Sequence, residues 1–116
     1  MERPHFSILA HPTGRLLGTR DASPFDMDKV MRAARGRGCF LELNAQPERM
    51  DLSDVYCQAA KGAGVLISIG SDSHRTTDFD FLRFGVGQAR RGWLEKTDVL
   101  NTRPLRELRV LLRRTM

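Results

Sequence analysis

The sequence predicts an α/β fold in which repeated βα units build a parallel sheet with its loops gathered at the carboxyl ends of the strands. One observation is that three short apolar segments, residues 7–10, 39–44 and 65–69, have the length of buried strands. A second is that segments with apolar residues at helical spacing separate and follow these strands. A third is that no repeat, low-complexity segment or obvious linker divides the 116 residues, which indicates a single domain.

Residues 7–10 form the first expected strand, and residues 26–37 form the first expected helix, with Ser23 or Asp26 as its N-cap and Gly36 or Gly38 at its end. Residues 39–44 form the second strand. Ser53 is expected to cap a helix through Lys61 that the following glycines, Gly62 and Gly64, terminate.

The third strand covers residues 65–69, and two further helices are expected at about 78–91 and 104–114. Residues 98–101 lie between these helices and fit either a short final strand or a turn. At 41% hydrophobic residues the chain can form a core, but it is short for a complete α/β barrel, which needs ~200 residues or more.

Composition favours a cytoplasmic protein. No segment has the ~18 uncharged apolar residues of a membrane span, and the N-terminus lacks the apolar core of a signal peptide. The two cysteines, Cys39 and Cys57, are too few and too far apart for a disulfide framework, so we expect buried thiols in a reducing compartment.

The net charge of +5 suits a protein that meets polyanions, and much of the positive charge lies towards the C-terminus. In residues 104–114 the leucines recur at helical spacing with arginines between them. Two interpretations stay open for these arginines: a solvated helix face, or a contact with nucleic acid.

Two short motifs follow predicted strands, His11-Pro12-Thr13-Gly14-Arg15 and Ser71-Asp72-Ser73-His74. In an extended segment the side chains of Asp72 and His74 leave the same face of the chain. Imidazole and carboxylate are suitable ligands for zinc, manganese or iron in hydrolysis, so His11, Asp72 and His74 are candidate metal ligands. The alternative is that these residues only cap or decorate the loops.

Glu42 and Asn44 share one face of the second strand and point to the same rim. A carboxylate in an apolar strand needs a partner, because an unpaired buried charge is costly. Glu42 therefore forms an internal salt bridge to an arginine or, the interpretation we favour, helps to orient a ligand histidine.

Arg15 follows the turn beside His11, where a guanidinium suits a phosphate oxygen; a salt bridge to Asp21 or Asp26 is the alternative. His5 precedes the first strand without a partner at useful spacing, and we interpret it as a surface or loop residue.

Five segments together resemble the C-terminal part of the PHP (polymerase and histidinol phosphatase) domain of bacterial family X DNA polymerases. The resemblance runs in order along nearly the whole chain, through residues 11–17, 41–45, 71–74, 83–96 and 98–102.

The resemblance implies part of a distorted (βα)7, TIM-like PHP barrel with a centre of up to three divalent metals, manganese or zinc. It implies hydrolysis of phosphodiesters as a 3′-5′ exonuclease on DNA ends in DNA repair. It also implies that His11, Asp72 and His74 are metal ligands, with Asp72 and His74 in the catalytic centre.

The ligand motifs that the family places before this region have no counterpart here. We therefore expect residues 1–116 to be a partial PHP domain that is inactive alone and has a partial or empty metal site. Whether the chain is itself an enzyme stays open, and so do two alternatives: a non-catalytic scaffold or interaction module, and a phosphatase for small esters. Half a barrel leaves an unpaired strand edge, so a homodimer is a further expectation.

Overall fold

The chain folds into a three-stranded parallel sheet with helices packed around it. The structure is a computed structural model that describes residues 6–14 and 26–115. In chain order its regular elements are β1 (Ile8–Leu9), α1 (Met27–Arg37), β2 (Phe40–Asn44), α2 (Asp54–Ala63), β3 (Ile67–Gly70), the 3-10 helix η1 (Thr76–Phe81), α3 (Leu82–Arg91), the 3-10 turns η2 (Lys96–Asp98) and η3 (Leu100–Thr102), and α4 (Leu105–Arg113).

The strand order β1-β2-β3 and the parallel pairing confirm the predicted repeated βα units. Leu9 pairs with Leu41 across the first strand pair, and Asn44 pairs with Gly70 at the end of the second. Because the strands are parallel, their carboxyl ends and the loops that follow meet at one edge of the sheet.

Local capping explains where the first two helices begin and end. The Asp26 carboxylate accepts the N–H of Lys29, and Ser53 accepts the N–H of Tyr56. The left-handed residues Gly38 and Gly64 end α1 and α2. Gly36 and Gly62 instead lie inside the helices, and Ser23, the alternative cap, lies outside the described residues.

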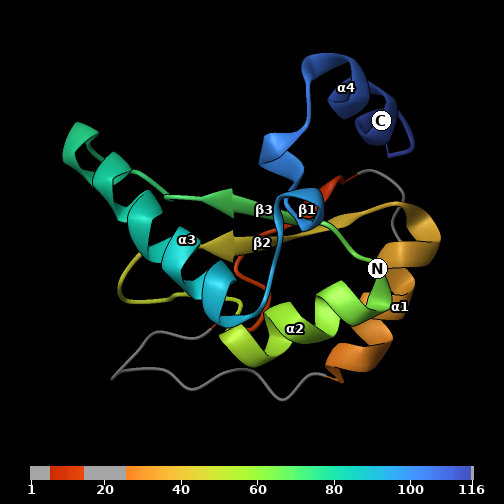
Figure 1. Cartoon of the computed structure of the whole chain (residues 1–116), viewed down its shortest axis with the longest axis horizontal. Coiled ribbons are helices and arrows are strands. Elements are labelled where there is room, and N and C mark those ends of the chain that lie inside the picture. Colours follow the sequence, from red (N-terminus) through yellow and green to blue (C-terminus); the bar gives the residue numbers. More distant parts are fainter. Residues whose placement is uncertain (1–5, 15–25, 116) are drawn as a thin grey trace.

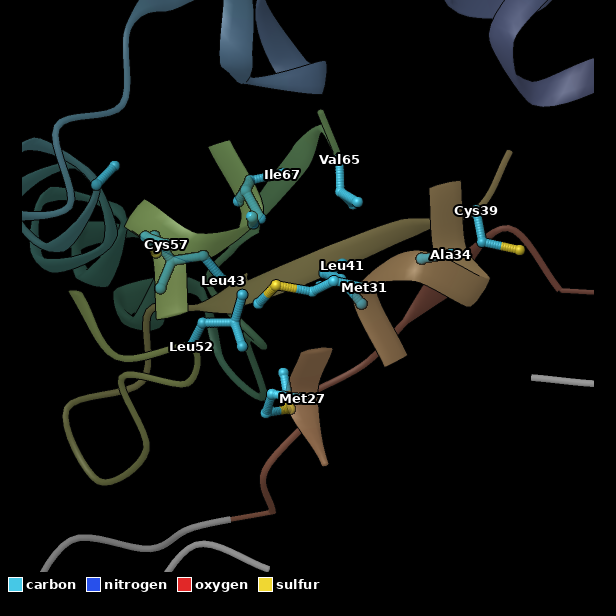
Figure 2. Close-up of a cluster of buried hydrophobic side chains, with 12 residues drawn as sticks. Met27, Met31, Ala34, Cys39, Leu41, Leu43, Leu52, Cys57, Val65 and Ile67 are labelled. Carbon is cyan, nitrogen blue, oxygen red and sulfur yellow. The ribbon is translucent and has the colours of Figure 1, made fainter. Parts of the chain in front are cut away.

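The hydrophobic core lies between the sheet and the helices α1 and α2, which stand side by side below the strands in Figure 1. Figure 2 shows Met31 of α1 directed towards Leu41 and Leu43 of β2, with Leu52 and Cys57 in the same cluster. Cys39 and Cys57 are buried free thiols, as the sequence predicts.

Residues 76–102 differ in detail from the sequence-based expectation. The helix expected at about 78–91 divides into η1 and α3, and residues 98–101 form turns in which Val99 makes an isolated parallel bridge to Ile67. The side chain of Asn101 then pairs with the backbone of Ile69, with its Oδ1 2.8 Å from the N–H and its Nδ2 2.9 Å from the carbonyl. The outer edge of β3 is therefore covered.

The last helix, α4, lies on the opposite side of the strands from α1 and α2 in Figure 1. None of its residues is buried, although its leucines have helical spacing. Within the described residues, no helix has both the length and the apolar character that crossing a membrane requires.

Candidate functional site at the carboxyl ends of the strands

The three candidate metal ligands line one polar cavity. His11 follows β1, and Asp72 and His74 follow β3, so the parallel order brings both loops to the same edge of the sheet. The cavity has a volume of about 500 Å³ and is lined by His11, Gln46, Glu48, Arg49, Asp72, His74, Arg75 and Asp78. The sequence-based expectation that these loops meet at one rim agrees with this geometry.

Glu42 and Asn44 connect the two loops through hydrogen bonds. Glu42 Oε1 accepts the backbone N–H of His11 at 2.9 Å and the Asn44 amide at 3.2 Å. The same amide group of Asn44 donates to Asp72 Oδ2 at 3.1 Å. These contacts tie Glu42 to the backbone of the loop that carries His11, and its role in orienting a ligand histidine stays a prediction.

The glycine at position 70 leaves room for this arrangement. A Cβ at Gly70 would stand 3.2 Å from Glu42 Oε2, which is tighter than an ordinary van der Waals contact. Gln46, at the end of the network, donates from its side chain to the carbonyls of Ser71 and Asp72 at 3.0 and 2.8 Å. The loop after β3 is thus held from the side of β2.

Two of the candidate ligands have positive φ angles, a backbone conformation that residues other than glycine rarely adopt. The φ angle is +25° at His11 and +51° at Asp72. Such conformations cost roughly 1–3 kcal/mol each and recur at functional sites. The segment 71–74 is therefore not the regular extended segment that the sequence suggested, because Asp72 has a left-handed backbone conformation.

His74 has a defined ring orientation. Its Nδ1 lies 2.7 Å from the carbonyl oxygen of Asp72, and because a carbonyl only accepts, Nδ1 carries the proton. In the neutral ring Nε2 is then the nitrogen with a lone pair. A backbone carbonyl that fixes the tautomer in this way is a usual partner of a metal-binding histidine.

Asp78 also supports His74, and sequence reasoning missed it. Its buried carboxylate accepts the backbone N–H of His74 at 3.0 Å and lies 3.7 Å from Nε of Arg75. A short polar side chain four residues after His74 was the only hint in the sequence, and it does not specify this contact.

Asp51 is a second residue that the sequence did not indicate. It is fully buried, and its carboxylate accepts the backbone N–H groups of Thr13 and Gly14 in the loop that carries His11. The sequence carried no local signal for it, because its partners are 37 and 38 positions away along the chain.

The side chains of His11, Asp72 and His74 are suitable ligands for a divalent metal, but only together with further ligands. Imidazole and carboxylate are the expected ligand types, and the tautomer of His74 is suitable. Within residues 6–14 and 26–115, however, no three side chains of His, Cys, Asp or Glu converge closely enough to hold an ion. Arg15 and His5 lie outside the described residues, so the structure does not test their predicted roles.

Comparison with known proteins confirms the resemblance to family X polymerases. The chain is 41% identical over 110 residues to the DNA polymerase/3′-5′ exonuclease PolX of Bacillus subtilis, covering 95% of this chain and 19% of that protein. It is 31% identical over 98 residues to a "probable phosphatase" of Vibrio parahaemolyticus, covering 78% of this chain and 40% of that protein. A "probable phosphatase" of Acetivibrio thermocellus is 30% identical over 106 residues, which cover 85% of this chain and 39% of that protein.

No protein-family model matches the chain. The chain spans about a fifth of the length of the polymerase and about two fifths of the length of the phosphatases.

Proposed function

We propose that this chain forms part of a metal-dependent PHP phosphoesterase site, of the kind expected for the 3′-5′ exonuclease domain of a bacterial family X DNA polymerase. The observation that carries the proposal is that His11, Asp72 and His74, from loops after two strands of one parallel sheet, line the same polar cavity. The 41% identity to a polymerase/3′-5′ exonuclease supports it.

In this proposal His11, Asp72 and His74 hold divalent manganese or zinc, up to three ions in the complete domain. A bound ion of this kind supplies a more acidic water as nucleophile and neutralises charge on the phosphate. His74 binds through Nε2, because Nδ1 donates to Asp72. Glu42 keeps the His11 loop at the end of β2, and Asn44 restrains the Asp72 carboxylate.

The phosphate group is bound by arginines at the rim of the cavity. Arg15 is the sequence-based candidate, and Arg75 is a second one because it lines the cavity beside His74. Nε of Arg75 lies 3.7 Å from Asp78 Oδ1, and the Arg75 side chain is 78% exposed. A guanidinium oriented in this way suits the oxygens of a phosphate ester.

We further propose that residues 1–116 are one partial PHP domain, from the C-terminal part of the barrel, and that other ligands complete the metal centre. The described residues contain no three-ligand group, so precise metal geometry requires additional donors. The isolated chain is therefore expected to be inactive as a nuclease. Its proposed substrate in the complete protein is a DNA 3′ end, in DNA repair.

Two alternative functions have specific observations in their favour: a phosphatase for small esters and a non-catalytic scaffold or interaction module. The relatives described as probable phosphatases favour hydrolysis of small phosphate esters. The lack of three converging ligands in the described residues favours a scaffold or interaction module without catalysis.

The test begins with Mn²⁺ binding by the purified 116-residue chain, measured by titration calorimetry. We expect weak binding that decreases in His11→Ala, Asp72→Asn and His74→Ala but not in His5→Ala, a histidine that the resemblance does not mark as a ligand. Equal binding by all four variants and the unsubstituted chain would contradict the metal site and favour the scaffold, whereas no binding at all would mean that these residues hold an ion only together with the additional ligands.

Activity assays with added Mn²⁺ distinguish the substrates. A labelled DNA 3′ end and a small phosphate monoester are incubated with the chain and with His74→Ala. We expect background rates on both. Manganese-dependent digestion of the DNA end that His74→Ala abolishes would overturn the expected inactivity, and turnover of the monoester alone would favour the phosphatase.

We also propose that the chain self-associates through β1. The outer edge of β3 is covered by Val99 and Asn101, whereas β1 stands at the other end of the strand order with Ile8 38% exposed. Light scattering at micromolar concentration is expected to show a dimer that Ile8→Lys dissociates. A monomer at these concentrations would count against the proposal.

The buried free thiols Cys39 and Cys57 suit a reducing compartment, and we propose the cytoplasm.

A further inference from the structure

Asp51 places a fully buried carboxylate under the loop that carries His11. Its Oδ2 accepts the N–H of Thr13 at 3.0 Å and of Gly14 at 2.8 Å, and its Oδ1 lies 3.2 Å from the N–H of Thr13. The residue is 0% exposed, so these N–H groups replace water around the charge. A buried carboxylate is stable only with such partners.

The N–H groups of Thr13 and Gly14 belong to successive residues, and Gly14 has a φ of +67°. Successive N–H groups in a turn of this kind form a concave site that attracts anions. Here the Asp51 carboxylate occupies this site. The loop therefore uses its N–H groups at 13 and 14 to bind the protein itself, and phosphate must be bound by other groups.

The backbone of Asp51 is in turn fixed to the end of β2. Asp51 and Asn44 form an antiparallel bridge in which the Asn44 N–H donates to the Asp51 carbonyl at 2.5 Å and the Asp51 N–H donates back at 3.2 Å. The Asn44 side chain then bonds Glu42 and Asp72. One residue thus connects the His11 loop to the strand that restrains Asp72.

The segment around Asp51 is also held from α3. The buried side-chain amide of Gln88 lies 3.4 Å from the carbonyl of Met50 and 3.3 Å from the carbonyl of Leu52. Contacts on both sides of Asp51 limit its movement. The Asp51 carboxylate can therefore hold the loop after β1 in one position.

We propose that Asp51 is a positioning residue that holds the loop after β1 so that His11 faces the cavity shared with Asp72 and His74. The proposal rests on the proposed role of His11 as a metal ligand. Asp51 itself does not line the cavity, and it acts through the backbone of Thr13 and Gly14.

The first test needs neither a metal nor a substitution. Amide hydrogen exchange of the 116-residue chain, followed by NMR, is expected to show Thr13 and Gly14 protected to about the level of Asn44. Fast exchange at both amides would overturn the proposal, because the Asp51 contacts would then not persist in solution. This result is independent of whether the chain binds a metal.

The second test uses Asp51→Asn, with Asp80→Asn as a charge-matched control on the exposed surface. Asparagine has nearly the same shape but is neutral, and with its oxygen in the place of Oδ2 its NH₂ donor lies in the place of Oδ1, against the N–H of Thr13. We expect faster exchange at Thr13 and Gly14 and shifted ring resonances of His11. Unchanged exchange and unchanged His11 resonances in a folded Asp51→Asn would overturn the proposal.

Mn²⁺ titration separates positioning from a purely structural role. Loss of a residue that orients a ligand typically lowers metal affinity roughly 10–100-fold. We expect Asp51→Asn to weaken Mn²⁺ binding to this extent well below its unfolding temperature, and to add little to His11→Ala in the double variant. Unchanged affinity in Asp51→Asn would overturn the positioning role. If His11→Ala also leaves Mn²⁺ binding unchanged, the proposed metal role of His11 fails, and the NMR readouts still decide the role of Asp51.

Discussion

The strand β2 and the helix α4 are both rich in leucine, but they differ in how far their side chains are buried. Leu41 and Leu43 of β2 are 0% exposed, whereas no residue of α4 is buried and Leu105 is 61% exposed. β2 has a strand on each side and helices over its face, as Figure 1 shows. Regular apolar spacing therefore defines an element, and its burial depends on whether another layer covers it.

This difference also determines where a site can be built. The end of β2 is hydrogen-bonded to its neighbours on both sides, so Glu42 and Asn44 contact two loops at once. Helix α4 offers no comparable support in the described structure. Four predictions test this contrast between a covered and an uncovered element.

The largest effect is expected for Leu43→Ala in β2. The substitution leaves a cavity in the core and should lower the free energy of unfolding by about 2–5 kcal/mol. The matched substitution Leu105→Ala in α4 should change it by less than about 0.5 kcal/mol, because this side chain is mostly exposed. Urea unfolding of both variants measures the difference. Similar losses in the two variants would mean that α4 is packed in solution.

The contrast also explains which parts of the fold the sequence predicts. Strands and helices follow from local apolar spacing and local caps, so β2 and α1 appear at nearly their predicted bounds. The meeting of the loops at His11 and Asp72 follows from parallel topology alone.

Contacts between distant backbone groups and side chains escaped prediction. Asp51 bonds residues that are 37 and 38 positions away, and Asn101 bonds Ile69 from 32 positions away. No residue type or spacing signals such a partner before the chain is folded. The partial burial of α4 was not predictable for the same reason: Leu108, Leu111 and Leu112 are half-buried and Leu105 is exposed, although the leucine spacing alone is that of a covered helix.

The second prediction concerns the close approach of α3 to the sheet. A Cβ at Gly85 would stand 2.7 Å from Cγ2 of Ile69 and 2.9 Å from Cβ of Ala45. Gly85→Ala should therefore cost about 1–3 kcal/mol of stability through overpacking.

The control for this prediction lies two residues further along the same helix. A Cβ at Gly87 would meet no neighbouring atom within 4 Å, so Gly87→Ala should stabilise the chain by about 0.5–1 kcal/mol through helix propensity. Thermal unfolding of the two variants should shift the midpoint in opposite directions. A stabilising Gly85→Ala would show that α3 lies further from the sheet than the structure indicates.

The third prediction concerns Asn101, whose side chain covers the outer edge of β3. Asn101→Ala removes both hydrogen bonds to Ile69 and should cost about 0.5–1.5 kcal/mol, since water can replace part of the lost interaction. It should also increase self-association by exposing the strand edge. Thr97→Ala, at an exposed position nearby, is the control for both unfolding and light scattering. An unchanged stability in Asn101→Ala would mean that the edge is covered in another way.

The smallest effect is expected for Asp98, in the segment that leads from the packed body towards α4. Burial raises the pKa of Asp98, but the N–H of Glu95 and the cations of Lys61 and Arg103 outweigh it, so the pKa lies below its usual value. The Lys61 ammonium lies 3.0 Å from Asp98 Oδ2 and joins this segment to α2.

The sign of the pH dependence follows from this lowered pKa. As the pH falls, the unfolded chain binds the Asp98 proton first, near the ordinary aspartate value of ~3.9. The stabilisation from Asp98 is therefore complete above that value and is lost as the pH falls through the lower folded pKa. For a partly exposed pair the amount is below about 1 kcal/mol. Urea unfolding from pH 7 to pH 2.5 should show the stability difference between the unsubstituted chain and Asp98→Asn shrinking at the acid end, while Asp80→Asn shows no such trend. A difference that stays constant down to pH 2.5 would mean that the Asp98 carboxylate contributes nothing through its charge, and that the connection towards α4 depends on packing alone.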